Sequence, residues 1–74
     1  MGAHEYKRHP LISKLMTIRI ALGLHQQDVA DAGGLNRNTV GTIESGKRNP
    51  SLDIFSRYCR GLGYEVDIKP IEEG

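Results

Sequence analysis

The chain of 74 residues contains no tryptophan, one phenylalanine and a single cysteine, Cys59. One cysteine excludes an internal disulfide, and no cysteines and histidines stand at the spacing of a zinc site. No apolar run approaches the roughly 18 residues that a membrane helix needs, and the polar start lacks the apolar stretch of a secretion signal. These absences predict one small cytoplasmic domain with no membrane association and a modest apolar core.

A catalytic constellation and a cofactor motif are also missing. His4, His9 and His25 have no acidic or cysteine partner at ligand spacing, so we expect solvated histidines and no metal site. Cys59 falls on the apolar face of a predicted helix without a base nearby in sequence, which favours a core role over a nucleophile. The sequence therefore predicts no enzyme, no catalytic residue and no cofactor.

Net charge is only +1, but the charges are unevenly distributed along the chain. Residues 65–74 contain four acids and one base, a net charge of −3, whereas the first 64 residues carry nine bases and five acids, a net charge of +4. A basic globule with an acidic tail permits phosphate binding without establishing it, because scattered surface lysines are common.

Periodicity predicts helices, because apolar residues recur at helical spacing between residues that end or begin helices. Gly23, Gly46 and Gly63 are predicted helix ends, and Asn36 and Ser51 are predicted N-caps. The first helix should bury Leu11, Leu15, Ile18 and Leu22, and the fourth Leu52, Phe55, Cys59 and Leu62. The predicted helices cover residues 11–22, 26–33, 37–44 and 52–62.

The segment 64–69 alternates apolar and polar residues, which predicts a half-buried strand that Pro70 ends. The predicted fold class is all-α, a compact four-to-five-helix domain with a short C-terminal β-strand. Residues 1–10 are predicted to be a flexible N-terminal arm, residues 11–63 the helical domain, and residues 64–74 a strand with an acidic tail.

The spacing of small and apolar residues between Gln26 and Ser45 fits two helices that cross through a tight turn. Ala30 is small where these helices must touch, and Gly34 follows four residues later, where a left-handed conformation is required. Val40 and Ile43 lie on the inward face of the second of these helices. These positions fit the helix-turn-helix template, whose second helix enters the major groove of DNA.

A longer run of residues strengthens this interpretation: GLHQQDVADAGGLNRNTVGTIESGKRNPSL resembles the lambda-repressor-like (Cro/C1, XRE) helix-turn-helix family. The resemblance extends upstream through Leu15, Ile18 and Arg19 and downstream to Gly63. The chain departs from the family at His25, where a serine or threonine cap is usual, at Gly61, where alanine is usual, and at Gly41 inside the third helix. Gly41 is either tolerated drift or a sign that this helix presses close to DNA.

The resemblance implies which residues meet DNA. The first turns of the third helix would face base edges. The start of the second helix and the loop after the third helix would face phosphates. The alternative is that these side chains are solvated polar groups that bind nothing. Lys7 and Arg8 would either reach DNA or remain idle. The base-reading candidates are Arg37, Asn38, Thr39 and Thr42, and the phosphate-binding candidates are Gln26, Gln27, Lys47, Arg48 and Asn49.

Arg19 and Glu44 resemble an internal ion pair of the family that joins the first helix to the third. Its implied role is architectural, and the alternative is two exposed charges that do not interact.

The function implied by this resemblance is a sequence-specific transcriptional regulator, a repressor that binds a palindromic operator in double-stranded DNA as a homodimer. The predicted strand is the candidate interface, through Tyr64, Val66 and Ile68, unless it folds back on its own helices. An antitoxin-type interaction protein that binds a toxin and represses its own operon is the alternative. Met16 and Ile20, apolar positions off the core face of the first helix, keep that alternative open together with the predicted strand.

Overall fold

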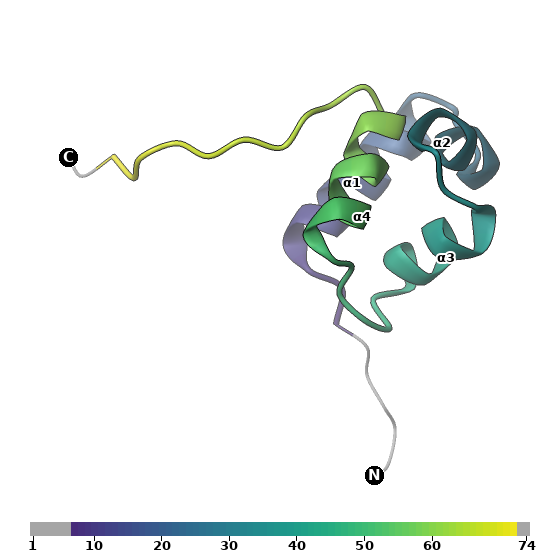
Figure 1. Cartoon of the computed structure of the whole chain (residues 1–74), viewed down its shortest axis with the longest axis horizontal. Helices are drawn as coiled ribbons and strands as arrows, with labels where there is room; N and C mark the ends of the chain where they lie inside the picture. The colour runs from purple at the N-terminus through teal and green to yellow at the C-terminus, as the bar shows by residue number, and fades with distance from the viewer. Residues whose placement is uncertain (1–6, 73–74) are drawn as a thin grey trace, which may run out of the picture.

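The computed structural model describes residues 7–72, which form four helices and an extended C-terminal tail (Figure 1). The α2 helix packs against both α3 and α4, while α1 packs against α3. The predicted all-helical class is confirmed, and α1 begins one residue earlier than expected, inside the predicted N-terminal arm, whose residues 1–6 lie outside the described part of the chain. The helices are α1 (Pro10–Ala21), α2 (Gln26–Gly33), α3 (Arg37–Ser45) and α4 (Leu52–Gly61).

Asn36 and Ser51, the residues before α3 and α4, cap these helices, as local sequence predicts. Asn36 Oδ1 accepts a hydrogen bond of 2.8 Å from the Thr39 amide, and Ser51 Oγ accepts one of 3.2 Å from the Ile54 amide. At α2 the departure from a serine or threonine cap is offset, because Asp28 Oδ2 accepts a hydrogen bond of 2.7 Å from the His25 amide. Each bond satisfies a donor that the helix start would otherwise leave without a partner.

The turn between α2 and α3 depends on Gly34, which adopts φ +71° at the C-cap of α2. A side chain is rarely tolerated in this left-handed conformation, so glycine allows the chain to reverse within a few residues. The α2 and α4 helices approach so closely that a Cβ at Gly61 would lie 2.8 Å from Val29 Cγ1. The glycine at position 61 therefore reflects tight packing between helices rather than drift.

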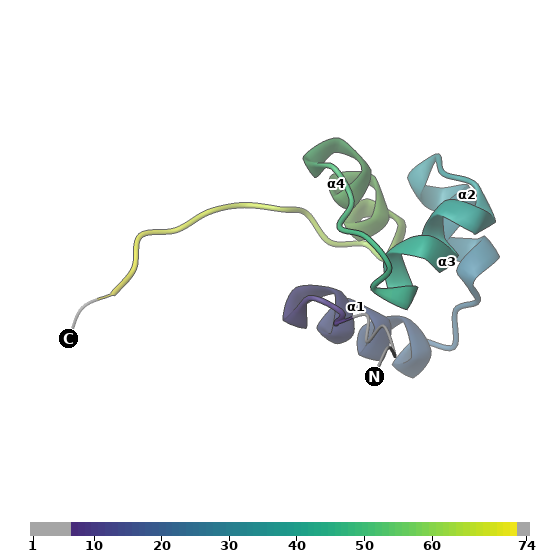
Figure 2. The same cartoon turned by 90° about the horizontal axis from the view of Figure 1, so that it is seen from below.

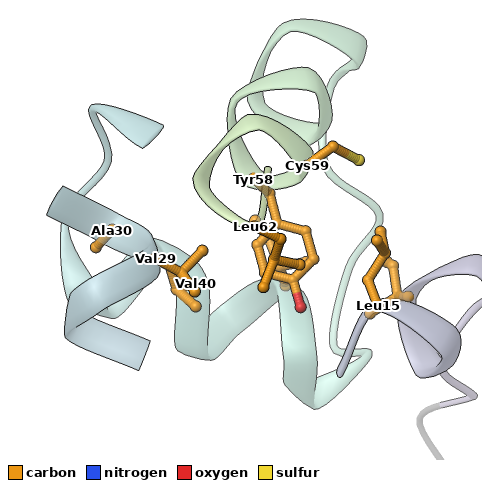
Figure 3. Close-up of a cluster of buried hydrophobic side chains, with 9 residues drawn as sticks. Leu15, Val29, Ala30, Val40, Tyr58, Cys59 and Leu62 are labelled. Atoms are coloured by element: carbon orange, nitrogen blue, oxygen red, sulfur yellow. The ribbon is translucent and has the colours of Figure 1, made fainter. Parts of the chain in front are cut away.

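The core lies where α2, α3 and α4 meet and extends to α1 (Figure 3). Tyr58, Val29 and Val40 have no exposed surface, and Tyr58 is the largest of them. Sequence periodicity missed Tyr58. The remaining buried apolar residues are Ile12, Leu15, Ala30, Ile43, Cys59 and Leu62.

Three residues expected in the core are exposed instead. Leu11 and Leu22 are 53% and 58% exposed at the two ends of the α1 region, and Leu52 is 85% exposed in the first turn of α4. The α1 sequence is apolar on nearly every side, so its pattern does not decide between Leu11 and the neighbouring Ile12, which is 3% exposed. The predicted burial of these three leucines is wrong.

The predicted strand over residues 64–69 is also wrong for the single chain. After Gly63, the Tyr64 amide donates a hydrogen bond of 2.9 Å to the Cys59 carbonyl, and residues 65–72 then run outward as an extended tail (Figures 1 and 2). Between residues 7 and 72 no strand forms. A strand needs a neighbouring strand to share its hydrogen bonds, and four helices provide none.

Residues 7–72 offer neither a membrane-spanning helix nor a cluster of metal-binding side chains. None of the helices in this part of the chain combines the length and apolar character needed to cross a bilayer. The same residues contain no group of three or more histidine, cysteine, aspartate and glutamate side chains placed to hold a metal. His4 lies outside the described residues.

Candidate nucleic-acid interface

A groove of about 410 Å³ with both polar and apolar lining lies between α3 and the loop that joins it to α4. Asn38, Thr39 and Thr42 line it from α3, and Arg48 and Asn49 line it from the loop. The structure thus brings together predicted base-reading and phosphate-binding residues that are up to eleven positions apart in the sequence. Arg37 and Lys47 are exposed outside the lining, at the start of α3 and just after its end.

The candidate base-reading residues differ in what their side chains already contact. Arg37, Asn38 and Thr42 are exposed, and within residues 7–72 their side chains form no hydrogen bond. Thr39 is half-buried, and its hydroxyl donates a hydrogen bond of 3.0 Å to Asn36 Oδ1. Thr39 therefore takes part in capping α3, which leaves the other three side chains available for a ligand.

Ser45, which the sequence did not single out, links the end of α3 to Lys47. Its hydroxyl donates a hydrogen bond of 2.8 Å to the Thr42 carbonyl and accepts one of 3.1 Å from the Lys47 amide. The end of α3 is thus joined to the first residue of the basic loop, which consists of Lys47, Arg48 and Asn49. Its position three residues after Thr42 places Ser45 on the same helical face, which is the signal that a search of the sequence could use.

The Glu44 carboxylate lies at the centre of the molecule and binds a side chain from each of the other three helices. Arg19 of α1 donates from Nε to Oε2 at 2.8 Å and from Nη2 to Oε1 at 2.9 Å. Gln26 of α2 donates to Oε1 at 3.0 Å, and Tyr58 of α4 donates to Oε2 at 2.7 Å. The structure therefore brings Arg19 and Glu44 together in a pair whose side chains are only 13% and 3% exposed.

The electrostatics of this network favour the charged form of Glu44. Burial alone raises the pKa of its carboxyl, but hydrogen bonds from Arg19, Gln26 and Tyr58 outweigh burial and hold the pKa below its ordinary value. The hydrogen bond to Glu44 raises the pKa of Arg19, and burial raises the pKa of the Tyr58 hydroxyl well above its ordinary range. Burial also raises the pKa of the Cys59 thiol, which disfavours the reactive thiolate.

The two glutamines at the start of α2 lie outside the groove. Gln26 is half-buried with its amide nitrogen on Glu44, whereas Gln27 is exposed and donates a hydrogen bond of 2.8 Å to Asp31 Oδ1. A Cβ at Gly41 would meet only Gln26 Oε1, at 3.9 Å, an ordinary van der Waals distance. Packing within the described chain therefore does not require the glycine at position 41.

Comparison with known proteins connects this geometry to a family. A family model described as Helix-turn-helix matches residues 15–69. The chain is 31% identical over 64 residues to an uncharacterized HTH-type transcriptional regulator of Haemophilus influenzae, and the match covers 86% of this chain and 65% of that protein. It therefore spans slightly less than two thirds of that relative's length.

Two archaeal proteins and one solved structure are also similar. An uncharacterized HTH-type transcriptional regulator of Methanothermobacter thermautotrophicus is 40% identical over 47 residues, covering 64% of this chain and 68% of that protein. One of Methanocaldococcus jannaschii is 33% identical over 55 residues, covering 74% and 83%. The crystal structure of the clp gene regulator ClgR from C. glutamicum matches with a TM-score of 0.66 at 22% identity, over 78% of this chain and 75% of that one. The ClgR match shows a shared fold.

Proposed function

The chain belongs to the lambda-repressor-like (XRE, Cro/C1) helix-turn-helix family, a family of regulators rather than enzymes, and from this premise we propose that it is a sequence-specific DNA-binding transcriptional regulator. In this proposal α3 lies in the major groove of double-stranded DNA and the chain acts as a repressor. The carrying observation is that Arg37, Asn38 and Thr42 are exposed on α3 with no side-chain hydrogen bond within residues 7–72.

The chemistry of these three side chains suits base edges. Arginine makes two parallel hydrogen bonds to guanine, asparagine does the same to adenine, and threonine offers a hydroxyl and a methyl group. Thr39, although half-buried, donates its hydroxyl proton to Asn36 and keeps its methyl group and both hydroxyl lone pairs for a ligand. We assign base reading to α3 because its backbone is already ordered and capped, so that binding has to order only the side chains.

Phosphate contacts would come from the residues on either side of α3. Lys47, Arg48 and Asn49 are exposed in the loop after it, and Gln26 and Gln27 begin α2, where backbone amides point outward. Gln26 donates to Glu44, so its amide oxygen and second amide hydrogen remain for DNA. These contacts would fix the orientation of α3 without reading sequence.

Gly41 supports the close approach of α3 to a ligand. Glycine inside a helix costs about 0.5–1 kcal/mol relative to alanine, and the space around position 41 would accept a Cβ. A helix face that omits this side chain lets the backbone come nearer to a neighbouring molecule. In the proposed complex that molecule is DNA.

We also propose that the regulator is a homodimer whose interface is the C-terminal tail. Tyr64, Val66 and Ile68 are 49%, 46% and 91% exposed, and a groove of about 300 Å³ lies between α1, α4 and the base of the tail. Two antiparallel tails would supply each other's strand hydrogen bonds and cover these apolar side chains. The tail leaves the body on the side away from α3, so such a dimer would keep both α3 helices free (Figures 1 and 2).

A second candidate function is supported by a separate exposed surface. Ile20 of α1 is 62% exposed and Met16, one helical turn before it, is half-buried, which suits a toxin partner of an antitoxin that also represses its own operon. Co-expression with the product of a neighbouring reading frame tests it. A complex that forms with the wild-type chain and is lost in the Met16→Ser/Ile20→Ser variant would favour this function.

Selection of bound sites from random double-stranded DNA tests the proposed regulator directly. We expect enrichment of one palindromic motif by the wild-type chain and loss of that preference in Arg37→Ala. Arg60→Ala is the matched control, because it removes the same charge from the last turn of α4. Failure of the wild-type chain to enrich any motif would contradict the proposal.

A further inference from the structure

The segment before α1 contacts the far end of α3. Arg8 Nε donates a hydrogen bond of 2.6 Å to the backbone carbonyl of Glu44, which is 36 positions away in the sequence. The backbone of residue 8 itself lies against Gly46, since a Cβ at Gly46 would be 3.0 Å from both the amide nitrogen and the Cα of Arg8. Two independent features, a side-chain hydrogen bond and backbone packing, thus join this segment to the end of α3.

The end of α3 has a physical need for such a contact. The last carbonyls of a helix lack intrahelical partners and carry partial negative charge, which a nearby cation stabilises. Arg19 and Arg60 lie in the last turns of α1 and α4, whereas α2 and α3 have no basic residue in theirs. Arg8 supplies that positive charge from elsewhere in the chain.

Gly34 provides an internal comparison for Gly46. Both glycines are helix C-caps in the left-handed region, with φ +71° and +77°. Space for a Cβ is open around Gly34, with nothing within 4 Å, whereas Arg8 covers Gly46. Conformation alone would accept asparagine at either position, so the contact with Arg8 is what distinguishes the two.

The contact with Arg8 holds Glu44, the residue whose carboxylate joins α3 to the three other helices. The Glu44 carboxylate is held by three side chains, and Arg8 holds the carbonyl of the same residue on the backbone side. One residue later, Ser45 connects the helix end to Lys47. The position of the basic loop relative to α3 therefore depends on how firmly this last turn is held.

We propose that Arg8 is a positioning residue for DNA recognition: it fastens the end of α3 and thereby sets the basic loop, and it does not itself neutralise a phosphate. This inference rests on the proposed DNA binding of α3. Removal of Arg8 loosens the last turn of α3 and the amides that follow it. Gly46 is required because a side chain there would displace residue 8.

The first test uses the free protein and needs no DNA. Nuclear magnetic resonance of the Arg8 Nε–H group should show slow exchange with solvent in the wild-type chain and in Gly34→Asn, and fast exchange in Gly46→Asn. Arg8→Ala should speed amide exchange at Gly46 and Lys47, and Arg60→Ala should not. Fast exchange of Arg8 Nε–H in the wild-type chain, or its protection in Gly46→Asn, would overturn the inference.

The second test separates positioning from phosphate binding by salt titration on the selected operator. Arg8→Ala should weaken operator binding about two- to fivefold, the usual effect of a charge at a helix end, with an unchanged slope of log affinity against log salt. A fall in the slope of about 0.9 would identify Arg8 as a phosphate ligand instead, and equal affinity to Arg60→Ala would show that Arg8 has no part in binding. If the wild-type chain selects no operator, the proposed function fails, while the exchange measurements still decide whether Arg8 holds α3.

Discussion

The Tyr58 hydroxyl donates a hydrogen bond of 2.7 Å to Oε2 of Glu44, which joins the largest fully buried side chain to the one buried charged residue within residues 7–72. Core packing and the charge network thus meet at this bond. Burying a tyrosine is favourable only if its hydroxyl has a partner, and burying a carboxylate is favourable only if its oxygens have donors. Each residue satisfies a requirement of the other.

Tyr58→Phe should lower the free energy of unfolding by about 1.5–3 kcal/mol, the range for a hydrogen bond to a charged group. The ring would still fill its place in the core, so the loss isolates the hydroxyl. Urea unfolding of the two proteins measures the difference. Tyr64→Phe is the control, because Tyr64 is 49% exposed and should show no loss. Equal stability of Tyr58→Phe and the wild type would contradict the role of this bond.

Arg19→Ala should cost about 3 kcal/mol or more, because it leaves the buried Glu44 carboxylate without its cation. Arg19→Ala/Glu44→Ala should cost less than the sum of the two single changes, since the stranded charge is then absent. A double-mutant cycle followed by thermal or urea unfolding measures the coupling. Additive losses would show that the two residues act independently.

Acid should destabilise the fold through Glu44. The pKa of its carboxyl is below the ordinary 4.5 in the folded chain, so the ionised form contributes stability above that ordinary value. That contribution is lost as pH falls through the folded pKa, where both states bind the proton. Unfolding midpoints measured from neutral to acidic pH should fall less steeply for Glu44→Gln than for the wild type, and parallel curves would refute the assignment.

Base reading and phosphate binding should separate in a salt titration. Arg37→Ala should cost about 1–3 kcal/mol on the selected operator and much less on scrambled DNA. Lys47→Ala and Arg48→Ala should weaken binding to both DNAs, each lowering the slope of log affinity against log salt by about 0.9. An equal loss of affinity for Arg37→Ala on both DNAs would contradict the assignment of base reading to α3.

Deleting residues 64–74 should convert the proposed dimer into monomers in sedimentation experiments. Val66→Glu/Ile68→Glu should do the same, because charge on the apolar side of the tail opposes pairing with its twin. Leu52→Glu is the control, since Leu52 is 85% exposed, close to the 91% of Ile68, but lies at the start of α4, away from the tail. A dimer that survives loss of the tail would place the interface elsewhere.

Local signals in the sequence predicted the helices well, because each end is determined by a few neighbouring residues. Asn36 and Ser51 cap the helices that follow them, and Gly34 and Gly46 end the helices before them, as expected. Which face of a helix is buried depends on the helices around it. Periodicity therefore failed on Leu11 in the apolar α1 and predicted a strand where the chain has no partner strand.

The candidate site also combines features that local sequence predicts with features that depend on how the helices pack. The exposure of Arg37, Asn38 and Thr42 follows from their place on a helix whose opposite face is buried, and a sequence can reveal that. The contacts of Gln26 and Arg8 with Glu44 join segments 18 and 36 positions apart, so they depend on how the helices pack. No spacing rule predicts such contacts from the sequence.

The binding of the Glu44 carboxylate of α3 by side chains of the three other helices also bears on how the protein meets DNA. A local opening that frees α3 must break the bonds of Glu44 to Arg19, Gln26 and Tyr58 together, so α3 is expected to open only with the whole domain. A domain of this kind docks as a rigid body. The adjustment needed for a good fit then falls on the double helix, so base steps that α3 never touches would contribute to operator choice through the energy of bending them.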